Sequence, residues 1–408
     1  MTFADLQLNQ RIQSILSTQG FDTPTTIQSE AIPVILGNHD VLASAQTGTG
    51  KTAAFALPIL HNLEGSASRG LLKALILAPT RELALQTYES MQQWNAGSDL
   101  EMTVIYGGVP YETQIGALGK NPDVIVATPG RLIDLWEQGH ISFADLTYFV
   151  LDEVDQMLDL GFQEAIALLA KQKPEACRSL FFSATMPAEI KALADAILKD
   201  PVYIAAAPVA STLENIDQSL YFAERDMMDN LLIHLVRKSG FSSGMVFTRS
   251  RKVADILASH LSDAGFPAEA FHSDRSQAAR EYILGRFKTG ETKLLVATDI
   301  AARGIHVDGL SHVFNYGLPQ MSETYIHRIG RTGRAGACGI ALTIAEPQEY
   351  GMFTEVQKLM KRNVPVVGNH PFVTLTLQKA LIDVVEKQNK PKPAAKGGNN
   401  KKKRYNKR

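Results

Sequence analysis

The chain has 408 residues, of which 45% are hydrophobic and 20% charged, and its formal net charge is −1. This length exceeds what one ordinary core supports, so we expect two domains followed by a tail. No apolar stretch approaches the roughly 20 residues that span a bilayer, and two cysteines are too few for a disulfide framework. The first ten residues lack the basic and apolar segments of a secretory signal. We therefore expect a cytoplasmic, monomeric protein without a membrane partner.

The charge is unevenly distributed along the chain. Residues 387–408 contain ten Lys or Arg and no acidic residue, which leaves 31 basic against 42 acidic residues elsewhere, a net charge of −11. An acidic body cannot hold nucleic acid by bulk charge, so such binding requires a local groove or the tail itself. We expect the tail to be disordered and to tether nucleic acid, with a merely solubilising charge run as the alternative.

Short apolar runs alternate with longer helical patterns, which predicts an α/β fold with parallel sheets. In the first half we expect strands at 41–43, 75–78, 103–106, 124–127, 149–151 and 180–182. In the second half we expect strands at 245–247, 269–271, 294–297, 312–315 and 341–344. The small, polar segment 205–218 is typical of an exposed connection. We predict an N-terminal domain at 1–207, a linker at 208–218, a C-terminal domain at 219–386 and the tail at 387–408.

The stretch AQTGTGKT, Ala45 to Thr52, has the composition of a phosphate-binding loop. Gly48 and Gly50 free the backbone to wrap phosphate oxygens, Lys51 reaches the β and γ phosphates, and Thr52 offers a hydroxyl to Mg²⁺. A helix should begin here, with its positive end directed at the anion. The general pattern opens with Gly where this chain has Ala45, so a simple glycine-rich turn is the alternative for the loop taken alone.

About a hundred residues later, an apolar run ends in Asp152-Glu153-Val154-Asp155. A phosphate loop followed by an acidic pair at a strand end predicts hydrolysis of a nucleoside triphosphate. Asp152 is the candidate Mg²⁺ carboxylate, and Glu153 is the candidate general base for the attacking water. The alternative is an acidic cap at the start of a helix.

Further motifs occur in both halves of the chain. The first half contains GFDTPTTIQ (20–28), PTRELALQ (79–86), Gly107-Gly108, TPGR (128–131) and SAT (183–185). The second half contains MVFTRS (245–250), Gln277 with Arg280, ATDIAARGI (297–305) and HRIGRTGR (327–334). With these motifs, residues 1 to about 365 resemble the DEAD-box family of ATP-dependent RNA helicases.

The resemblance implies two tandem RecA-like domains, each a mainly parallel sheet flanked by helices, with a composite site for ATP and Mg²⁺ between them. It also implies RNA-stimulated ATP hydrolysis coupled to local, non-processive unwinding of RNA duplexes or to ribonucleoprotein remodelling, with ribonucleoprotein partners. Two alternatives stay open. One is a DNA helicase, and the other is an ATP-gated RNA clamp or scaffold with little turnover.

By the same resemblance, Gln28 reads the adenine edge and Phe21 stacks on the base. The phosphate-loop contacts are Ala45, Gln46, Thr47, Gly48, Thr49, Gly50, Lys51 and Thr52. Arg331 and Arg334 are implied arginine fingers for the γ phosphate, and with Arg328 they would share one face if helical. The residues implied to couple hydrolysis to domain motion and strand separation are Ser183, Thr185 and His327.

The implied RNA contacts lie in both domains and are mostly hydroxyls, amides and glycines, which suit sugar and phosphate rather than base edges. In the first domain they are Thr80, Arg81, Gly108, Thr128, Gly130 and Arg131. In the second domain they are Ser250, Gln277, Arg280, Thr298, Asp299 and Gly304. The chain departs from the family pattern at Val154, where alanine is usual, at Ser273, where glycine is common, and at His306, where an aspartate associated with the ribose is usual.

Overall fold

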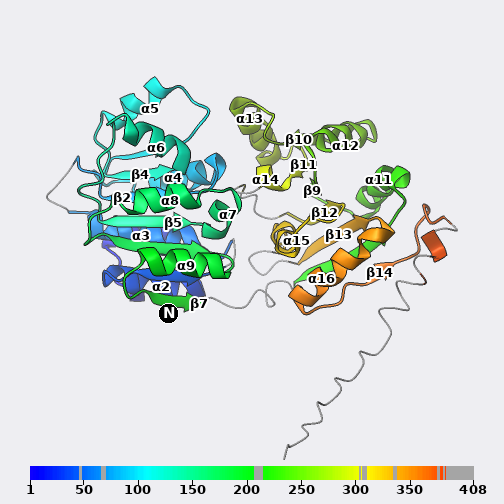
Figure 1. The fold of residues 1–408 in the computed structure, drawn as a ribbon, viewed down its shortest axis with the longest axis horizontal. Coiled ribbons are helices and arrows are strands. Elements are labelled where there is room, and N and C mark those ends of the chain that lie inside the picture. The colour runs from blue at the N-terminus through cyan, green and yellow to red at the C-terminus, as the bar shows by residue number, and fades with distance from the viewer. Residues whose placement is uncertain are drawn as a thin grey trace, which may run out of the picture.

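The computed structural model describes residues 1–45, 48–65, 70–205, 215–302, 305, 310–333, 338–374, 377–379 and 382. It contains two seven-stranded sheets in separate halves of the chain, with helices packed around each (Figure 1). Every strand pairing within the described residues is parallel. The predicted fold class, two tandem RecA-like domains, is confirmed. No helix in this described part has the length and apolar character that a membrane crossing requires.

The first sheet has the strand order β3-β4-β2-β5-β6-β1-β7. Its strands are β1 Val41–Ser44, β2 Ala74–Leu77, β3 Met102–Ile105, β4 Val124–Ala127, β5 Tyr148–Asp152, β6 Arg178–Ser183 and β7 Val202–Ala205. The helices of this domain are η1 Phe3–Leu6, α1 Gln10–Thr18, α2 Thr26–Leu36, α3 Lys51–Leu63, α4 Arg81–Trp94, α5 Tyr111–Leu118, α6 Pro129–Glu137, α7 Val154–Asp159, α8 Gln163–Ala170 and α9 Ala188–Ile197.

The second sheet has the equivalent order β10-β11-β9-β12-β13-β8-β14. Its strands are β8 Ile216–Phe222, β9 Gly244–Thr248, β10 Ala268–Phe271, β11 Leu294–Thr298, β12 His312–Tyr316, β13 Gly339–Ala345 and β14 Val366–Val367. The helices of this domain are η2 Arg225–Met227, α11 Met228–Lys238, α12 Arg251–Asp263, α13 Gln277–Lys288, α14 Asp299–Ala302, α15 Ser322–Ile329, η3 Pro347–Glu349 and α16 Tyr350–Met360.

The central strands are buried on both faces, which explains their continuous apolar runs. On β2, Ile76 packs into a core under α2, α3 and α4, whereas Leu75 and Leu77 pack into a second core under α6, α8 and α9. Alternation along a strand thus divides its side chains between two helical layers. Each fully buried aliphatic side chain contributes about 1.5–3 kcal/mol to this arrangement.

All eleven strands expected from sequence are present, with ends that differ by at most two residues. Three further strands in the described residues were not expected. β7 is an edge strand with mostly exposed side chains, and β14 has only two residues. β8 alternates buried with more exposed positions and begins at Ile216, inside the range 208–218 that we expected to form the linker. These strands lie near one edge of their sheets, where the continuous apolar run is lost.

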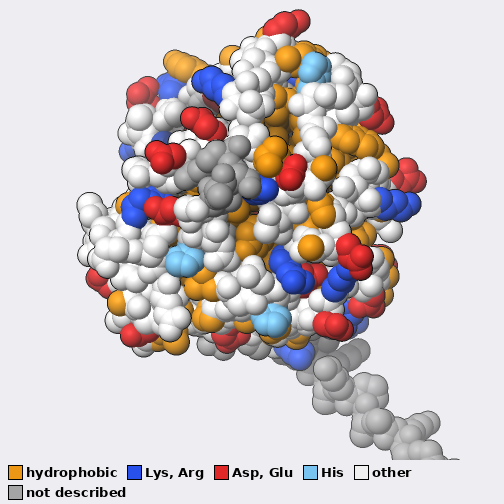
Figure 2. Space-filling model, turned by 90° about the vertical axis from the view of Figure 1, so that its left-hand side faces the viewer, with side chains coloured by type: hydrophobic (Ala, Val, Ile, Leu, Met, Phe, Trp, Pro, Cys, Tyr) orange, Lys and Arg blue, Asp and Glu red, His pale blue; other side chains and the backbone are white. Residues whose placement is uncertain are grey.

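Figure 2 shows one face of the molecule, on which Lys and Arg side chains are interspersed with Asp and Glu. Mixed charges of this kind create no single-sign field that would attract a polyanion. The face agrees with the expectation that the body does not hold nucleic acid by bulk charge.

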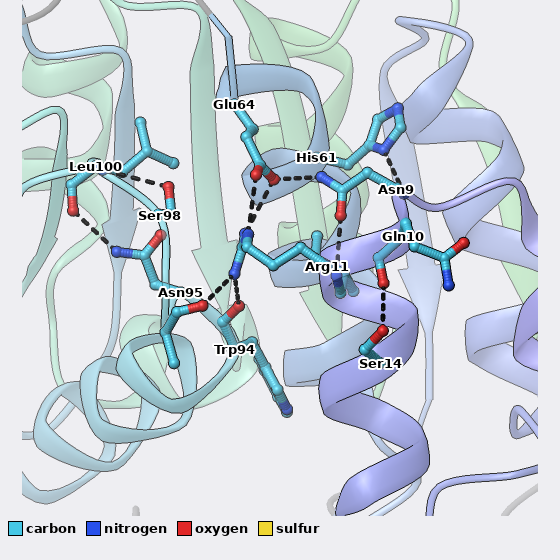
Figure 3. Close-up of polar contacts among 12 residues, drawn as sticks. Asn9, Gln10, Arg11, Ser14, His61, Glu64, Trp94, Asn95, Ser98 and Leu100 are labelled. Carbon is cyan, nitrogen blue, oxygen red and sulfur yellow. Dashed lines mark hydrogen bonds and ion pairs between the residues drawn. The ribbon is translucent and has the colours of Figure 1, made fainter.

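The N-terminal helix α1 is fixed to the first domain by Arg11 (Figure 3). The Arg11 guanidinium donates to both carboxylate oxygens of Glu64, at 2.9 and 3.0 Å, just beyond the end of α3. Arg11 Nη1 also donates to the backbone oxygens of Trp94, the last residue of α4, at 2.7 Å, and of Ala96, at 3.0 Å. This contact holds α1 on the domain, and the chain leaving α1 enters the segment 20–28.

Candidate active site and RNA interface

Three motifs of the first domain, the phosphate loop AQTGTGKT, the acidic DEVD and SAT, meet at one edge of the sheet. In the parallel register, Ser44 on β1 lies beside Ser183 on β6, and Asp152 on β5 lies beside Phe182 on β6. The carboxyl ends of β1, β5 and β6 are therefore adjacent. In open parallel α/β sheets, ligands bind outside such strand ends.

Lys51 and Asp152 are charged groups buried at this edge, with 5% and 2% of their surfaces exposed. Helix α3 begins at Lys51, as expected, and Gly50 before it has φ of +89°. Neither Lys51 Nζ nor Asp152 Oδ1 has a hydrogen-bond partner among the described residues. Buried polar atoms of native proteins normally have partners, so these two indicate a ligand.

Burial raises the pKa of Asp152 to about 7, opposed by the positive charge of Lys51 and reinforced by the neighbouring carboxylate of Glu153. A bound cation would favour the ionised form of such a carboxyl group. No group of three or more His, Cys, Asp or Glu side chains among the described residues forms a ready metal cage. Mg²⁺ does not need one, because it is usually held by one or two carboxylates together with substrate phosphates. The donor set therefore fits Mg²⁺.

Glu153 connects β5 to α7 in a left-handed conformation, with φ of +55°. This conformation costs a non-glycine residue about 1–2 kcal/mol. Only 2% of the residue is exposed. Its carboxylate Oε2 accepts a hydrogen bond from Gln156 Nε2. Strained backbone of this kind is concentrated at functional sites.

Asp155 connects this edge to the SAT motif. Its Oδ2 accepts hydrogen bonds from the backbone N–H of Ala184, at 3.1 Å, and from the N–H and hydroxyl of Thr185, at 3.0 and 3.1 Å. In return, the Asp155 N–H donates to Ser183 Oγ at 3.3 Å. Ser183 and Thr185 are thus held by the same short segment that carries the catalytic candidates.

The segment before α2 contacts the phosphate loop directly. Gln28 Oε1 accepts from the Thr25 N–H at 2.9 Å, and Gln28 Nε2 donates to the Gly50 carbonyl at 3.2 Å. A Cβ atom at residue 50 would lie 2.2 Å from Gln28 Nε2, so this approach requires glycine. Phe21 is 49% exposed, which leaves its ring accessible for stacking.

Arg328 and Arg331 of HRIGRTGR do not lie on one helix, so the condition under which they would share a helical face is not met. Helix α15 ends at Ile329, after which Gly330 turns the chain. Arg328 is 1% exposed and forms a bidentate ion pair with Asp299, at 2.6 and 2.8 Å. Arg331 Nη1 donates to the carbonyl of Ile305 at 2.8 Å. His327 lies on α15 and is partly exposed.

Several predicted site residues lie outside the described residues. These are Gln46, Thr47, Gly304, His306 and Arg334, together with residues 208–214 of the predicted linker and the whole tail 387–408.

In the first domain, two predicted RNA-contacting arginines support the double-glycine loop. The Arg81 guanidinium lies so close to Gly108 that a Cβ atom there would be 2.3 Å from Nη1, and Gly108 has φ of +91°. Arg131 Nη1 donates to the Val109 carbonyl and to Gln114 Oε1, both at 3.0 Å. Thr80 caps α4, accepting from the Leu83 N–H at 3.2 Å. Thr128 precedes α6, and Gly130 lies within it.

In the second domain, the predicted RNA contacts lie at strand and helix ends. Ser250 caps α12 and accepts from the Val253 N–H at 3.3 Å. Thr298 ends β11, and Asp299 is engaged by Arg328. Gln277 begins α13 and donates to Glu281 at 3.0 Å. The guanidinium of Arg280 is directed away from its own domain, toward Glu82 on α4 at 3.0 Å.

Two family models match the chain. The model described as DEAD/DEAH box helicase matches residues 25–193, and the model described as Helicase conserved C-terminal domain matches residues 226–336. The chain is also 40% identical over 365 residues to the DEAD-box ATP-dependent RNA helicase CshA of Geobacillus kaustophilus, an alignment that covers 89% of this chain and 77% of that protein. The chain belongs to the DEAD-box family of ATP-dependent RNA helicases. The predicted family is thereby confirmed.

Other relatives of this DEAD-box protein support the same family assignment. RNA helicase CrhR of Synechocystis is 42% identical over 366 residues, covering 90% of this chain and 74% of CrhR. Among solved structures, S. cerevisiae Dbp5 bound to RNA and ADP BeF3 matches with a TM-score of 0.82 and 29% identity, covering 90% of this chain and 95% of Dbp5. Mss116p bound to ssRNA and AMP-PNP matches with a TM-score of 0.82 and 28% identity, covering 96% and 83% of the two chains.

The DEAD-box protein has a cavity of about 230 Å³ where α4 of the first domain faces α13 of the second. Its lining is Glu82, Leu85, Gln86, Glu89, Gln277, Glu281, Leu284, Gly285, Lys288 and Ile305. The Glu82–Arg280 ion pair lies next to this cavity, and both side chains are nearly buried. The motif residues of α4 and α13 thus form a contact between the domains.

Two residues of this site were not assigned roles from the sequence. Asp155 was part of the DEVD motif, and its place in the first turn of α7, directly after the catalytic pair, was the available signal. Glu82 belongs to the PTRELALQ motif, but nothing local to it indicates a partner 198 positions away in the chain. Such contacts depend on how two domains pack, which spacing within one motif does not encode.

Proposed function

We propose that this DEAD-box protein couples RNA-stimulated ATP hydrolysis to local, non-processive unwinding of RNA duplexes or to ribonucleoprotein remodelling. The proposal is carried by the buried edge of the first sheet, where Lys51 Nζ and Asp152 Oδ1 lack hydrogen-bond partners among the described residues. A buried charge without compensation is costly, so both atoms suit a phosphate and its cation. The names of the relatives, which include ATP-dependent RNA helicases, support the same activity.

In this proposal, ATP binds to Phe21, Gln28 and the loop from Ala45 to Thr52. Thr52 and Asp152 would hold Mg²⁺, which when bound neutralises charge on the phosphates. Lys51 contributes a positive charge to the phosphates, and Glu153 orients and deprotonates the attacking water. Because Gln28 also donates to the Gly50 carbonyl, adenine recognition is coupled to the shape of the phosphate loop.

RNA would bind along both domains through the predicted backbone contacts, and its binding with ATP would hold the domains together. The close domain arrangement would present Arg331 and Arg334 to the γ phosphate, where guanidinium groups stabilise developing charge. The ion pair between Glu82 and Arg280 supports a direct role for α4 and α13 in this closure. Asp155, through Ser183 and Thr185, would couple the state of the nucleotide to the rest of the domain.

The proposal is tested by Glu153→Gln, which keeps the shape of the side chain and removes its basicity. The variant should bind ATP and RNA as the natural protein does, while RNA-stimulated kcat falls by roughly 10²-fold or more. Steady-state ATPase rates and fluorescence titrations with a labelled RNA measure the two properties. Undiminished turnover would refute the assignment of Glu153 as base.

An ATP-gated clamp with little turnover is the second candidate function. It predicts that RNA release does not require hydrolysis, so wild type and Glu153→Gln would release RNA at the same rate after ATP is diluted. The buried carboxylate of Glu153, held at the turn after β5, favours the enzyme, because a clamp without turnover needs no general base for an attacking water.

We further propose that the protein acts in the cytoplasm as a monomer with ribonucleoprotein partners. The domains divide as 1–207 and 219–386, except that the first three residues of β8, from Ile216, belong to the second domain. The proposed RNA tether is residues 387–408, whose ten basic residues are not offset by any acidic one. Deleting this tail should weaken RNA affinity and reduce its salt dependence. Unchanged affinity across salt concentrations would leave only a solubilising role for the tail.

A further inference from the structure

Gln156 is a buried polar residue of the active-site edge to which no role has been assigned. It lies on α7, directly after the DEVD motif, and is 3% exposed. Its side-chain Nε2 donates a hydrogen bond to Glu153 Oε2, and its backbone N–H donates to Asp155 Oδ1 at 3.0 Å. Gln156 thus contacts the two carboxylates on either side of Val154.

The chemistry of the contact fixes the orientation of the amide. A carboxylate only accepts hydrogen bonds, so the NH₂ group must face Glu153 and the carbonyl oxygen must point away. That oxygen, Gln156 Oε1, is buried and has no hydrogen-bond partner among the described residues. An unpartnered buried acceptor destabilises the folded protein, whereas an apolar side chain of similar shape would avoid this cost. Packing alone therefore does not explain an amide at this position.

Glu153 needs a neighbour of this kind. Its backbone is in the left-handed region, which places it at a sharp turn between β5 and α7. A glutamate side chain has several rotatable bonds, and a general base must be held within hydrogen-bonding reach of the proton it removes. A hydrogen bond from Gln156 to Oε2 restricts the rotation of the Glu153 carboxylate.

We propose that Gln156 is a positioning residue for ATP hydrolysis, whose amide holds the Glu153 carboxylate in the orientation that activates the attacking water. The neutral amide orients the base without supplying a competing charge. The side chain of Gln156 contacts Glu153, and in this proposal its effect passes through that residue. The inference rests on the proposed role of Glu153 as base.

A double-mutant cycle separates this role from a structural one. It uses wild type, Gln156→Met, Glu153→Gln and the double variant, each assayed for RNA-saturated kcat, KM for ATP and thermal unfolding. Methionine keeps the length of the side chain and removes the donor. We expect Gln156→Met to lower kcat by about tenfold, part of the roughly 10²–10⁴-fold that a general base contributes, with little change in KM. Its melting temperature should be unchanged or raised, because the unpartnered carbonyl is gone.

The decisive comparison is between the effect of Gln156→Met on kcat in the wild-type protein and its effect in the Glu153→Gln variant. In Glu153→Gln, adding Gln156→Met should leave the residual kcat, measured in single-turnover reactions with excess enzyme, unchanged within about twofold. Gln156→Glu, which replaces the donor with a repelling acceptor, should reduce kcat at least as much as Gln156→Met. The proposal is overturned if Gln156→Met lowers kcat by the same factor in both backgrounds, or not at all. Full turnover by Glu153→Gln alone would instead reject the base assignment itself, so the two failures are distinguishable.

Discussion

The guanidinium of Arg280 lies 3.0 Å from the carboxylate of Glu82, and the two residues belong to different domains. Glu82 is on α4, one residue after Arg81, while Arg280 is on α13, with its guanidinium carbon 4.7 Å from the centre of the Phe271 ring. Burial lowers the pKa of Arg280, and the charge of Glu82 opposes that shift. An ion pair so nearly enclosed contributes only while the two domains stay together.

Removing the charge of Glu82 should therefore weaken the joining of the domains. Glu82→Gln should lower RNA affinity in the presence of a non-hydrolysable ATP analogue by about tenfold, since removing one partner of a nearly buried ion pair leaves the charge of the other uncompensated. Fluorescence energy transfer between a dye on each domain should show a smaller fraction of molecules in which the two domains are in contact.

Glu89→Gln is the matched control, because it removes one charge from the same helix at the same cavity. It should change RNA affinity by about twofold at most. Equal effects of the two substitutions would contradict a specific role for the Glu82–Arg280 pair and indicate a general effect of charge on α4.

The contact between Arg11 and Glu64 should make stability depend on pH. Hydrogen bonds from Arg11 hold the pKa of Glu64 below its ordinary value of 4.5. A lowered folded-state pKa adds stability that is present above the ordinary value and lost as pH falls through the folded value. Arg11→Met should thus cost about 1–2 kcal/mol at pH 7, and the difference from wild type should shrink below pH 4.5.

Urea unfolding at several pH values measures this effect. Arg225→Met is a suitable control, because Arg225 pairs with Glu346 at 3.4 Å but its side chain is 62% exposed. Exposed pairs contribute about 0–1 kcal/mol. A difference between Arg11→Met and wild type that stays constant down to pH 3 would show that Glu64 is not the titrating partner.

Val154 is the residue that departs from the family's usual alanine within the motif. It is fully buried, in the same apolar core as Met157 and Phe181. Val154→Ala removes two methyl groups from this core and should cost about 1–3 kcal/mol of stability. At a temperature where both proteins are folded, RNA-stimulated kcat should be the same within about twofold, because the side chain is part of the apolar core. A large change in kcat without a change in melting temperature would contradict this packing role.

Lys51 should be required for nucleotide binding rather than for RNA binding. Lys51→Ala removes the buried ammonium group and should weaken ATP affinity by about 30-fold or more, measured by calorimetry. RNA affinity without nucleotide should be unchanged. Normal ATP binding by the variant would refute the contact with phosphate.

Much of the fold was predictable because strands buried on both faces leave continuous apolar runs, as in residues 148–151. The active-site edge was predictable for the same reason, since parallel strands bring their carboxyl ends together and Asp152 and Lys51 each follow such a run. β7 and β14 were not predictable, because an exposed edge strand and a two-residue strand leave no run long enough to recognise.

The contacts of the second-domain arginines could not be predicted, because they join distant parts of the chain. The three-residue spacing of Arg328 and Arg331 was compatible with a helix, yet α15 ends at Ile329. Arg328 instead pairs with Asp299, and Arg331 donates to the Ile305 carbonyl. A buried guanidinium needs hydrogen-bond or ion-pair partners, and this requirement outweighs the spacing of the arginines in the sequence. The ion pair of Arg280 with Glu82 could not be predicted for a similar reason, because its partner lies in the other domain; the RNA contact expected of Arg280 stays a prediction.

In the proposed mechanism, RNA activates hydrolysis of ATP at the edge formed by Lys51, Asp152 and Glu153. The most direct measurement is the ATPase rate of the natural protein with single strands of matched sequence and length, one of RNA and one of DNA. Because the predicted contacts address sugar and phosphate, where the 2′-hydroxyl distinguishes RNA, we expect RNA to raise kcat at least tenfold above DNA, an effect lost in Glu153→Gln. Equal stimulation by RNA and DNA, or equal rates in wild type and Glu153→Gln, would contradict the account.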